Sequence, residues 1–353
     1  MNAPVKVATT VRAANLLDPA EARRIAGFVA EMRGSLFHLP AWLVGVERGT
    51  GQRAAGLVAE RMGTITGWLP LTEVRSALFG KALVSSGFGV GGGILACGDE
   101  AVLALAEGAR DYARRVGFAS VELRGGTIPA DWESWSDKHC GFERALAGDD
   151  DAELLAIPRK ARAEVRKGLG FGHRVTVGRG REDLAAHYAC YSASVRNLGT
   201  PVFPRALFAA MLEAFPDHSD ILTVWQGEIP LASVLNFYHD GAVMPFWGGG
   251  VFAARATRAN EVMYFELMLH ARRQGMTRFD FGRSKTGSGP FAFKKNWGFD
   301  PVPLTYGAWS APGAPARNID PTDASYSRKI ELWKKLPLPV ANILGPWIAR
   351  GLA

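Results

Sequence analysis

Three side chains able to exchange protons or bind charge follow one predicted strand in the second half of the chain. The strand is expected at residues 278–281, and Asp280, Arg283 and Ser284 lie at or just beyond its end. Strand ends are where the sheets of α/β proteins gather ligand-binding residues. Asp280 can accept a proton or orient Arg283, and Ser284 adds a hydroxyl. The alternative is a structural pair of Asp280 with Arg283.

A carboxylate on the preceding predicted helix is a further acid–base candidate. Glu266 lies between Phe265 and Leu267. An apolar neighbourhood raises the pKa of a carboxyl group towards the range of a general base. The alternative is an exposed position on the helix.

Histidines and cysteines form no metal-binding pattern in this sequence. The seven histidines include no HxH, HxxE or HExxH arrangement, and the three cysteines include no CxxC. Three widely separated cysteines also argue against a disulfide framework and are typical of a reducing cytoplasm. We therefore expect no metal, and a cytoplasmic protein.

Positive charge is concentrated at the start of the second half. Residues 158–181 contain eight lysines and arginines against one acid, Glu164. Pro158 can begin a helix that places Arg162 and Arg166 on one face. Like charges at this spacing repel, so we expect an anionic ligand to compensate them. A solvated helix face is the alternative.

The C-terminal segment combines cations with apolar residues. Residues 328–350 carry five basic residues against one acid, together with two tryptophans and three prolines. This composition suits an interfacial anchor on an anionic membrane better than a spanning helix. The alternative is a tail packed back on the first domain. A Pro-, Gly- and Ala-rich linker at residues 310–316 separates this tail from the second half.

An internal repeat supplies the framework for these residues. The run YARRVGFASVEL at residues 112–123 resembles HARRQGMTRFDF at residues 270–281 without a gap. Each copy predicts the end of a helix, a glycine stop and a strand. The first copy predicts a helix at residues 100–116 and a strand at 120–124; the second predicts the helix that carries Glu266.

Each copy is preceded by antiparallel strands. Residues 54–71 turn at Gly63, and residues 221–248 turn at Gly227 and Gly241. We therefore predict an α/β fold of two modules, at residues 1–150 and 151–309, each with a mixed, mostly antiparallel sheet flanked by helices. A tail at 310–353 follows.

The overall composition agrees with a folded protein. The chain has 353 residues, 48% hydrophobic and 21% charged, which excludes disorder and a coiled coil. The net charge of +7 admits a nucleic acid, a phosphorylated ligand or a membrane surface as partner. Residues 1–15 lack the apolar core of a signal peptide, and the uncharged stretch at 82–98 is too short and glycine-rich to span a bilayer.

Several motifs together resemble the FemAB-type acyltransferases. These are IPRKARAEVRKG at 157–168, GTPVFPR at 199–205, FDFGRS at 279–284 and GPFAFKKNWG at 289–298. The runs FHLPAW at 37–42 and WKKLPLPVAN at 333–342 resemble, more narrowly, the branch found alongside exosortase (PEP-CTERM) and exopolysaccharide systems. The resemblance covers nearly the whole chain.

This resemblance implies two copies of the GNAT acyltransferase module. Characterised members join amino acids, delivered on aminoacyl-tRNA, to the amine of a peptidoglycan precursor, and related double-GNAT proteins use acyl-CoA or an acyl carrier protein, including with lipid-type amines. We thus expect no tightly bound cofactor, an acyl donor of one of these three kinds and an amine acceptor from the envelope, from lipid or from exopolysaccharide synthesis. The inner face of the cytoplasmic membrane is the expected place of reaction.

The resemblance also assigns residues. It places Lys294 close to the reacting carbonyl, where its charge can stabilise an oxyanion or a carrier phosphate; the alternative is a surface lysine after Phe291 and Phe293. If this run is a strand, Lys295 points to the opposite face. Asp280 would then deprotonate the amine. The remaining candidates, for binding substrate, are Arg162, Arg166, Arg255, Arg258, Arg283, Ser284, Tyr238 and Trp247.

One departure weakens the case for CoA. GNAT enzymes that use acetyl-CoA cradle its pyrophosphate with a Q/R-x-x-G-x-G/A loop at a helix start. Here that position reads RATRAN at 255–260, without glycine, while the first half offers GGGILACG at 91–98. We interpret the first half as a binding and scaffold module. A non-catalytic double-GNAT protein that binds an envelope precursor or an exosortase-system partner is the alternative function.

Overall fold

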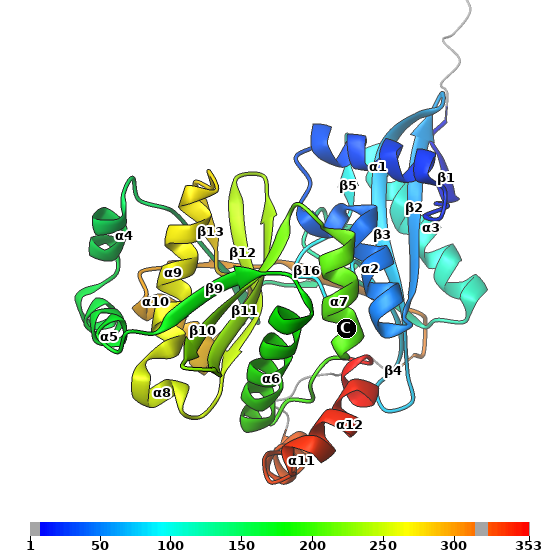
Figure 1. The fold of residues 1–353 in the computed structure, drawn as a ribbon. Coiled ribbons are helices and arrows are strands. Elements are labelled where there is room, and N and C mark those ends of the chain that lie inside the picture. Colours follow the sequence, from blue (N-terminus) through cyan, green and yellow to red (C-terminus); the bar gives the residue numbers. More distant parts are fainter. Residues whose placement is uncertain (1–7, 315–323, 353) are drawn as a thin grey trace, which may run out of the picture. The chain divides into compact units, whose positions relative to one another are not determined.

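The computed structural model describes residues 8–314 and 324–352 (Figure 1). Two compact units make up the chain. The first comprises Met1–Ser136, Thr305–Ile319 and Arg350–Ala353, and the second comprises Asp137–Leu304 and Asp320–Ala349. The end of the predicted linker at 310–316 and the first seven residues lie outside the described residues.

The first unit is built on an eight-stranded mixed sheet with the order β1-β2-β3-β4-β6-β16-β7, and β5 pairs with β3. Adjacent strands of this sheet pair antiparallel, except β4 and β6, which pair parallel. The strands are β1 (Thr10–Ala13), β2 (Arg53–Arg61), β3 (Thr64–Ser76), β4 (Gly80–Val84), β5 (Leu95–Ala96), β6 (Ser120–Arg124), β7 (Glu133–Trp135) and β16 (Tyr306–Ser310).

Both faces of the first sheet are buried because apolar residues occupy successive positions of its central strands. Leu57 joins the core beneath α3, whereas Val58 and Trp68 join the core beneath α1 and α2. Successive side chains of a strand point to opposite faces, so these strands need a helical cover on each side. The helices of this unit are α1 (Pro19–Glu31), the 3₁₀ turn η1 (Leu36–His38), α2 (Pro40–Thr50) and α3 (Asp99–Val116).

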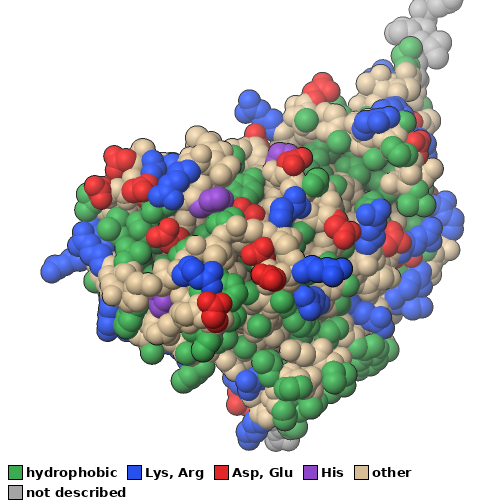
Figure 2. Space-filling view, in the orientation of Figure 1, with side chains coloured by type: hydrophobic (Ala, Val, Ile, Leu, Met, Phe, Trp, Pro, Cys, Tyr) green, Lys and Arg blue, Asp and Glu red, His purple; other side chains and the backbone are tan. Residues whose placement is uncertain are grey.

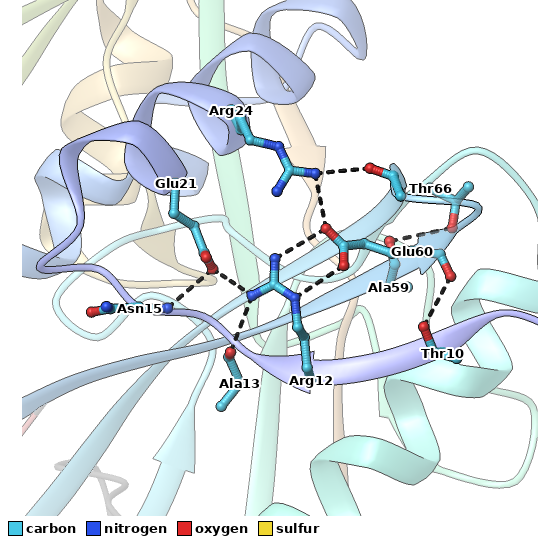
Figure 3. A network of polar contacts seen from close by, with 10 residues as sticks. Thr10, Arg12, Ala13, Asn15, Glu21, Arg24, Ala59, Glu60 and Thr66 are labelled. Carbon is cyan, nitrogen blue, oxygen red and sulfur yellow. Dashed lines mark hydrogen bonds and ion pairs between the residues drawn. The ribbon is translucent and has the colours of Figure 1, made fainter.

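A charge network fixes the edge strand β1 to the rest of the first unit (Figure 3). The Arg12 guanidinium donates to Glu60 on β2, at 3.0 Å through Nε, and to Glu21 on α1, at 2.7 Å through Nη1. Arg24 also donates to Glu60, at 2.9 Å. The hydrogen bonds from Arg12 and Arg24 lower the pKa of Glu60. These charges are engaged in holding strand to helix.

The second unit repeats the same plan. Its eight-stranded sheet has the order β14-β8-β13-β12-β11-β10-β9, with β15 paired to β8. Only β12 and β13 among these neighbours are parallel. The strands are β8 (His139–Ala145), β9 (Arg174–Gly178), β10 (Ser219–Gln226), β11 (Ile229–His239), β12 (Ala242–Gly250), β13 (Arg278–Asp280), β14 (Ser284–Lys285) and β15 (Pro301–Pro303).

Helices cover the two faces of the second sheet as they cover the first. Val234 on β11 joins the core beneath α9, while its neighbour Ser233 meets His187 of α6 on the other face. α5 packs on α9. The helices are α4 (Asp150–Ala156), α5 (Arg159–Leu169), α6 (Arg181–Leu198), α7 (Arg205–Ala214), α8 (Ala254–Thr257), α9 (Ala259–Arg273), α10 (Gly289–Asn296), α11 (Ala324–Lys334) and α12 (Leu338–Ala349).

The predicted repeat is present in both units. The helix expected at 100–116 is α3, the strand at 120–124 is β6, and the two β-rich runs form hairpins that turn at the expected glycines. The strand expected at 278–281 ends one residue earlier, as β13. Local sequence signals thus located these elements correctly.

Two strands cross between the halves of the chain, which changes the predicted boundary. β8 precedes residue 150 in the chain but pairs with β13 in the second sheet. β16 follows the second half but pairs with β6 and β7 in the first sheet. The structure therefore places residues 137–150 with the second unit and 305–310 with the first.

The C-terminal segment packs on the second unit, through contacts of α11 and α12 with α6. The alternative of a tail packed on the first domain is therefore wrong for residues 324–349. None of the helices in the described residues combines the length and the apolar character needed to cross a membrane.

Candidate active site at the end of strand β13

The end of β13 is shaped by a tight turn. The parallel pairing of β12 with β13 covers only Ala242 with Arg278 and Val243 with Phe279, after which the strands separate. The chain then turns at Gly282, whose φ of 70° favours glycine. The Asp280 carboxylate accepts a hydrogen bond of 2.8 Å from the Gly282 N–H and so fixes the turn.

The short helix α10 brings Lys294 to this turn. Ser288 caps the helix by accepting from the Phe291 N–H, and Pro290 lies in its first turn. Residues 291–294 therefore lie in a helix, so the strand on which the opposite orientation of Lys295 was conditional does not form. Lys294 is nevertheless set apart from its neighbour: its side chain is buried, whereas Lys295 is exposed.

Lys294 is a cation held by carbonyls and aromatic rings. Its Nζ donates to the carbonyl oxygens of Gly282 (3.2 Å) and Arg283 (3.1 Å). It also lies 5.3 Å from the ring centroids of Phe142 and of Phe281. The carbonyls occupy two of the three donors of an ammonium, which leaves the third to turn to a bound ligand.

The ionisation of Lys294 is shifted towards neutral pH. Burial lowers the pKa of Lys294 to about 8, against the opposing effect of the Asp280 charge, and the Arg283 charge lowers it further. A lysine whose pKa lies this close to physiological pH is unusual and is typical of functional sites.

Asp280 is shifted in the opposite direction. Burial raises the pKa of Asp280, and Glu143 adds to the effect, while the Gly282 hydrogen bond and the charges of Lys294 and Arg278 oppose it. The pKa of the carboxyl group is raised and the pKa of the amine is lowered, so both values move towards neutral pH. Groups with pKa values near the working pH are the most effective in proton transfer.

Ser284 and Arg283 complete this group. Ser284, on β14, is buried, and its hydroxyl has no hydrogen-bond partner within the described part of the chain. A buried polar group without a partner is costly unless a ligand or water satisfies it. Arg283 is half-buried beside it. The structure thus brings Asp280, Arg283, Ser284 and Lys294 to one turn, and their roles in binding and catalysis stay predictions.

Three other candidates lie elsewhere in the second module. Glu266 is half-buried and burial raises its pKa, but the charge that acts on it is Arg273, whereas Glu143, Lys294 and Arg278 act on Asp280. Trp247 is buried in an aromatic cluster, with Phe208 at 5.3 Å and other rings around it. This aromatic residue contributes to the core.

Tyr238 belongs to a separate polar cluster. Its hydroxyl donates to Asp220 at 2.7 Å, and Asp220 also lies 3.2 Å from Nε2 of His270. Burial and the Asp220 charge raise the pKa of Tyr238. No spacing in the sequence indicates this cluster, because its members come from β10, β11 and α9 and are far apart in the chain.

The basic residues form a second surface on α5. Pro158 is the N-cap, and the helix runs as predicted. Arg166 and Lys167 are exposed, while Arg162 is half-buried and donates to the Leu155 carbonyl at 3.3 Å. Figure 2 shows blue side chains at the left of the view, where Figure 1 places α4 and α5. This surface is open to a polyanion.

The start of α9, where a GNAT enzyme would cradle CoA pyrophosphate, is in contact with α5 and the segment after it, although Arg255 and Ala256 are exposed. A Cβ on Gly168 of α5 would lie 2.6 Å from Val262, so α5 packs closely on α9. The His173 ring is bonded to the Thr257 carbonyl at 3.1 Å. Arg258 is paired with Glu164, and Arg255 lies over the Phe252 ring. These two arginines are thus engaged within the protein.

One aromatic neighbour of Lys294 was not among the residues that the sequence indicated. Phe142, one of the rings beside Lys294, comes from β8, which lies in the predicted first half; the alternating run at residues 139–145 was the only sign of a strand there. The described residues contain no group of His, Cys, Asp and Glu side chains able to hold a metal ion.

Comparison with known proteins identifies the module that carries this site. The sequence model of the family described as acetyltransferase (GNAT) domain matches residues 158–295. Residues 158–295 thus carry a GNAT-type domain. The match spans α5, the β12–β13 pair and Lys294. No curated protein matches the chain in sequence.

Solved structures resemble the chain over both modules. FemX superimposes with a TM-score of 0.63 and 16% identity, over 81% of this chain and 95% of that chain. L-PGS from Bacillus licheniformis gives 0.52 and 16%, over 94% and 97%. A tandem GNAT protein from the clavulanic acid biosynthesis pathway gives 0.55 and 12%, over 87% and 99%. These identities establish fold alone, and the fold is the predicted pair of tandem GNAT-like modules.

Proposed function

We propose that this protein is an N-acyltransferase or aminoacyltransferase that forms an amide between an activated acyl group and an amine, at the end of β13. One observation carries the proposal. In a GNAT-type domain, the buried Lys294 ammonium, with a pKa lowered to about 8, lies on the turn after Asp280, whose own pKa is raised. Amide formation needs a proton acceptor and an oxyanion-stabilising charge, and this pair offers both.

The proposed roles follow from charge. Asp280 takes a proton from the acceptor amine, whose nitrogen attacks the acyl carbonyl carbon. The C–N bond forms while the carbonyl electrons move to oxygen, and the Lys294 ammonium stabilises the oxyanion. Collapse of the tetrahedral intermediate breaks the bond to the carrier, which leaves with its electron pair and receives the proton. Ser284 and Arg283 orient the substrates.

The donor is better explained as an aminoacyl-tRNA than as acyl-CoA. The start of α9 lacks the glycines of the usual pyrophosphate cradle, and Glu164 adds negative charge there. The exposed cations Arg166 and Lys167 on α5 suit a polyanionic carrier. The resemblance to FemAB-type proteins supports this choice. An acyl carrier protein is the second polyanionic donor that α5 could receive.

The acceptor is proposed to be an amine of an envelope, lipid or exopolysaccharide precursor at the inner face of the cytoplasmic membrane. The structural likeness to FemX and to L-PGS, a lysyl-phosphatidylglycerol synthetase, supports an envelope acceptor. The motifs at 37–42 and 333–342 support the exosortase-associated branch as the setting.

The test is a transfer assay on the purified chain. Envelope precursors with free amines are incubated with aminoacyl-tRNA, acyl-CoA or acyl carrier protein, and amide products are identified by mass spectrometry. We expect a product with aminoacyl-tRNA that ribonuclease abolishes. Amide formed only from acyl-CoA would contradict the choice of donor. Precursor binding without transfer from any donor would favour the non-catalytic alternative, which the missing cradle glycines at residues 255–260 also support.

The proposed binding of the donor by α5 is tested with a variant of α5 and a control variant of α1. The double variant Arg166→Gln/Lys167→Gln should weaken donor binding and make it less dependent on salt, with the log–log slope falling by roughly 0.7 to 0.9 for each phosphate that the variant no longer neutralises. Arg23→Gln removes an equally exposed cation from α1 and should change neither. Unchanged binding in the double variant would remove α5 from the donor site.

A further inference from the structure

The last helix of the chain is turned with its large apolar side chains outward. α12 buries Ala341, Gly345 and Ala349, its smallest residues. Four of its large apolar residues are exposed, Ile343 by 76%, Trp347 by 53%, Leu344 by 45% and Val340 by 40%, while Leu338 and Ile348 are half-buried. A helix that only had to pack on its own protein would bury the large residues and expose the small ones.

This orientation is fixed by close contacts of the buried face. A Cβ on Gly345 would lie 2.9 Å from the backbone nitrogen of Val202, so the helix lies directly on the segment after α6. The Asn342 side chain donates to the Ser192 hydroxyl of α6 at 3.4 Å, and Arg196 donates to the Lys334 carbonyl at 3.1 Å. Turning the apolar face of α12 inward would break the contacts of Gly345 and Asn342.

Cations accompany the exposed apolar residues. Between residues 329 and 349 the chain has Lys329, Lys334 and Lys335 against Glu331, a net charge of +2. Lys335 is exposed, as is Leu332 at the end of α11. Figure 2 shows hydrophobic side chains gathered at the foot of the view, where Figure 1 places α12.

We propose that α11 and α12 form a docking surface for a bilayer of anionic phospholipid. Aliphatic side chains with an outward tryptophan and adjacent lysines are the composition of helices that lie in the membrane interface. α12 has 12 residues, about 18 Å of helix, against the roughly 30 Å of a hydrocarbon core. It therefore lies on the bilayer. The charge favours this occupant, since anionic lipid complements lysines whereas a second copy would bring the same lysines.

The experiment measures binding of the full chain to vesicles by co-sedimentation. We expect binding to vesicles of phosphatidylglycerol and phosphatidylcholine, and at least tenfold weaker binding to phosphatidylcholine alone. The double variant Ile343→Asp/Trp347→Glu should lower binding at least tenfold. Ile229→Asp alters an equally exposed apolar residue in the β10–β11 hairpin and should bind as the wild type does. Circular dichroism confirms that each variant is folded.

Two further measurements test the role of the lysine charge and whether lipid or a second copy of the chain covers this face. Lys335→Gln should weaken binding to anionic vesicles about fivefold, in proportion to about 1 kcal/mol for one cation near the surface. Wild-type binding in the double variant would overturn the proposal, as would equal affinity for neutral vesicles. Sedimentation velocity without lipid should give the same oligomeric state for the wild type and the double variant; an oligomer that the double variant abolishes would assign the face to a second copy instead. This proposal does not depend on acyl transfer.

Discussion

The two modules share one plan and differ at the place where their parallel strands separate. In the first module β4 and β6 pair through Val84 and Glu122, and the glycine-rich segment that follows β4 then returns against the end of β6. Ile94 forms a parallel bridge with Gly126, and a Cβ on Gly93 would lie 1.8 Å from the Gly125 carbonyl oxygen. The described residues of the second module have no such bridge beside β13.

This difference explains how the same fold can act as a scaffold in the first module and carry the candidate active site in the second. The first module fills the space beside its strand end with its own backbone, which requires glycine on both sides of the contact. The second leaves its strand end to Asp280, Ser284 and Lys294. This agrees with our interpretation of the first half as a scaffold.

The charge network at β1 of the first module also differs from the charged groups at the end of β13. In the first module, Arg12, Arg24, Glu21 and Glu60 satisfy one another across strand and helix. In the second, burial holds Lys294 and Asp280 away from their ordinary pKa values without pairing them by a direct salt bridge in the described structure. Charges that are perturbed by one another in ion pairs hold elements together, whereas charges perturbed by burial without an ion pair are a mark of functional sites.

The largest expected effect comes from exchanging equivalent carboxylates. The repeat aligns Glu122 of β6 with Asp280 of β13. Asp280→Asn removes the proposed proton acceptor and should lower kcat/KM by about 10²- to 10⁴-fold. Glu122→Gln, the matched change in the first module, should leave kcat/KM within about twofold. Steady-state kinetics of both variants check this, and an equal loss in both would break the distinction between the modules.

The pH dependence should show the Lys294 titration. We propose that the charged form is active, and burial lowers its pKa to about 8. Activity should therefore decline as pH rises through 8, towards a tenfold loss per pH unit. In Lys294→Arg, whose guanidinium stays charged, this alkaline decline should disappear even if the rate at pH 7 is lower. A rate that increases through pH 8 would instead identify Lys294 as a neutral base.

A smaller effect, on stability, should follow from obstructing the backbone contact of the first module. Gly93→Ala forces a methyl group against the Gly125 carbonyl and should lower the free energy of unfolding by about 1 to 3 kcal/mol. Gly98→Ala, in extended backbone with open space around it, should be neutral. Urea denaturation of both variants measures the difference. Equal stability would mean that this contact is not tight in solution.

The sequence was sufficient for elements whose signals are local. α3 and β6 could be predicted because helical spacing, a glycine stop and a β-rich run follow one another within about 25 residues. The exchange of β8 and β16 could not, because strand pairing across the two halves has no local signature. For this reason the boundary was expected at residue 150, and the contribution of Phe142 to the site was not expected.

The sequence indicated which residues belong to the candidate site better than it indicated how they are buried and packed. Asp280, Arg283 and Ser284 are neighbours in sequence, and the resemblance supplied Lys294. The burial of Lys294 depends on α10, a helix of eight residues whose start is marked in the sequence by the cap Ser288 and by Pro290. The packing of α5 against α9 could not be predicted, because no spacing in the sequence indicates it.

One measurement tests the central claim most directly: the single-turnover rate of amide formation in Lys294→Met and in Lys295→Met. The two lysines are adjacent on α10, one buried against carbonyls and the other exposed. We predict that Lys294→Met lowers the rate about 10²- to 10³-fold with the fold intact, because the oxyanion loses its cation, and that Lys295→Met stays within about twofold. A wild-type rate in a folded Lys294→Met variant would contradict the assignment of the chemistry to this site.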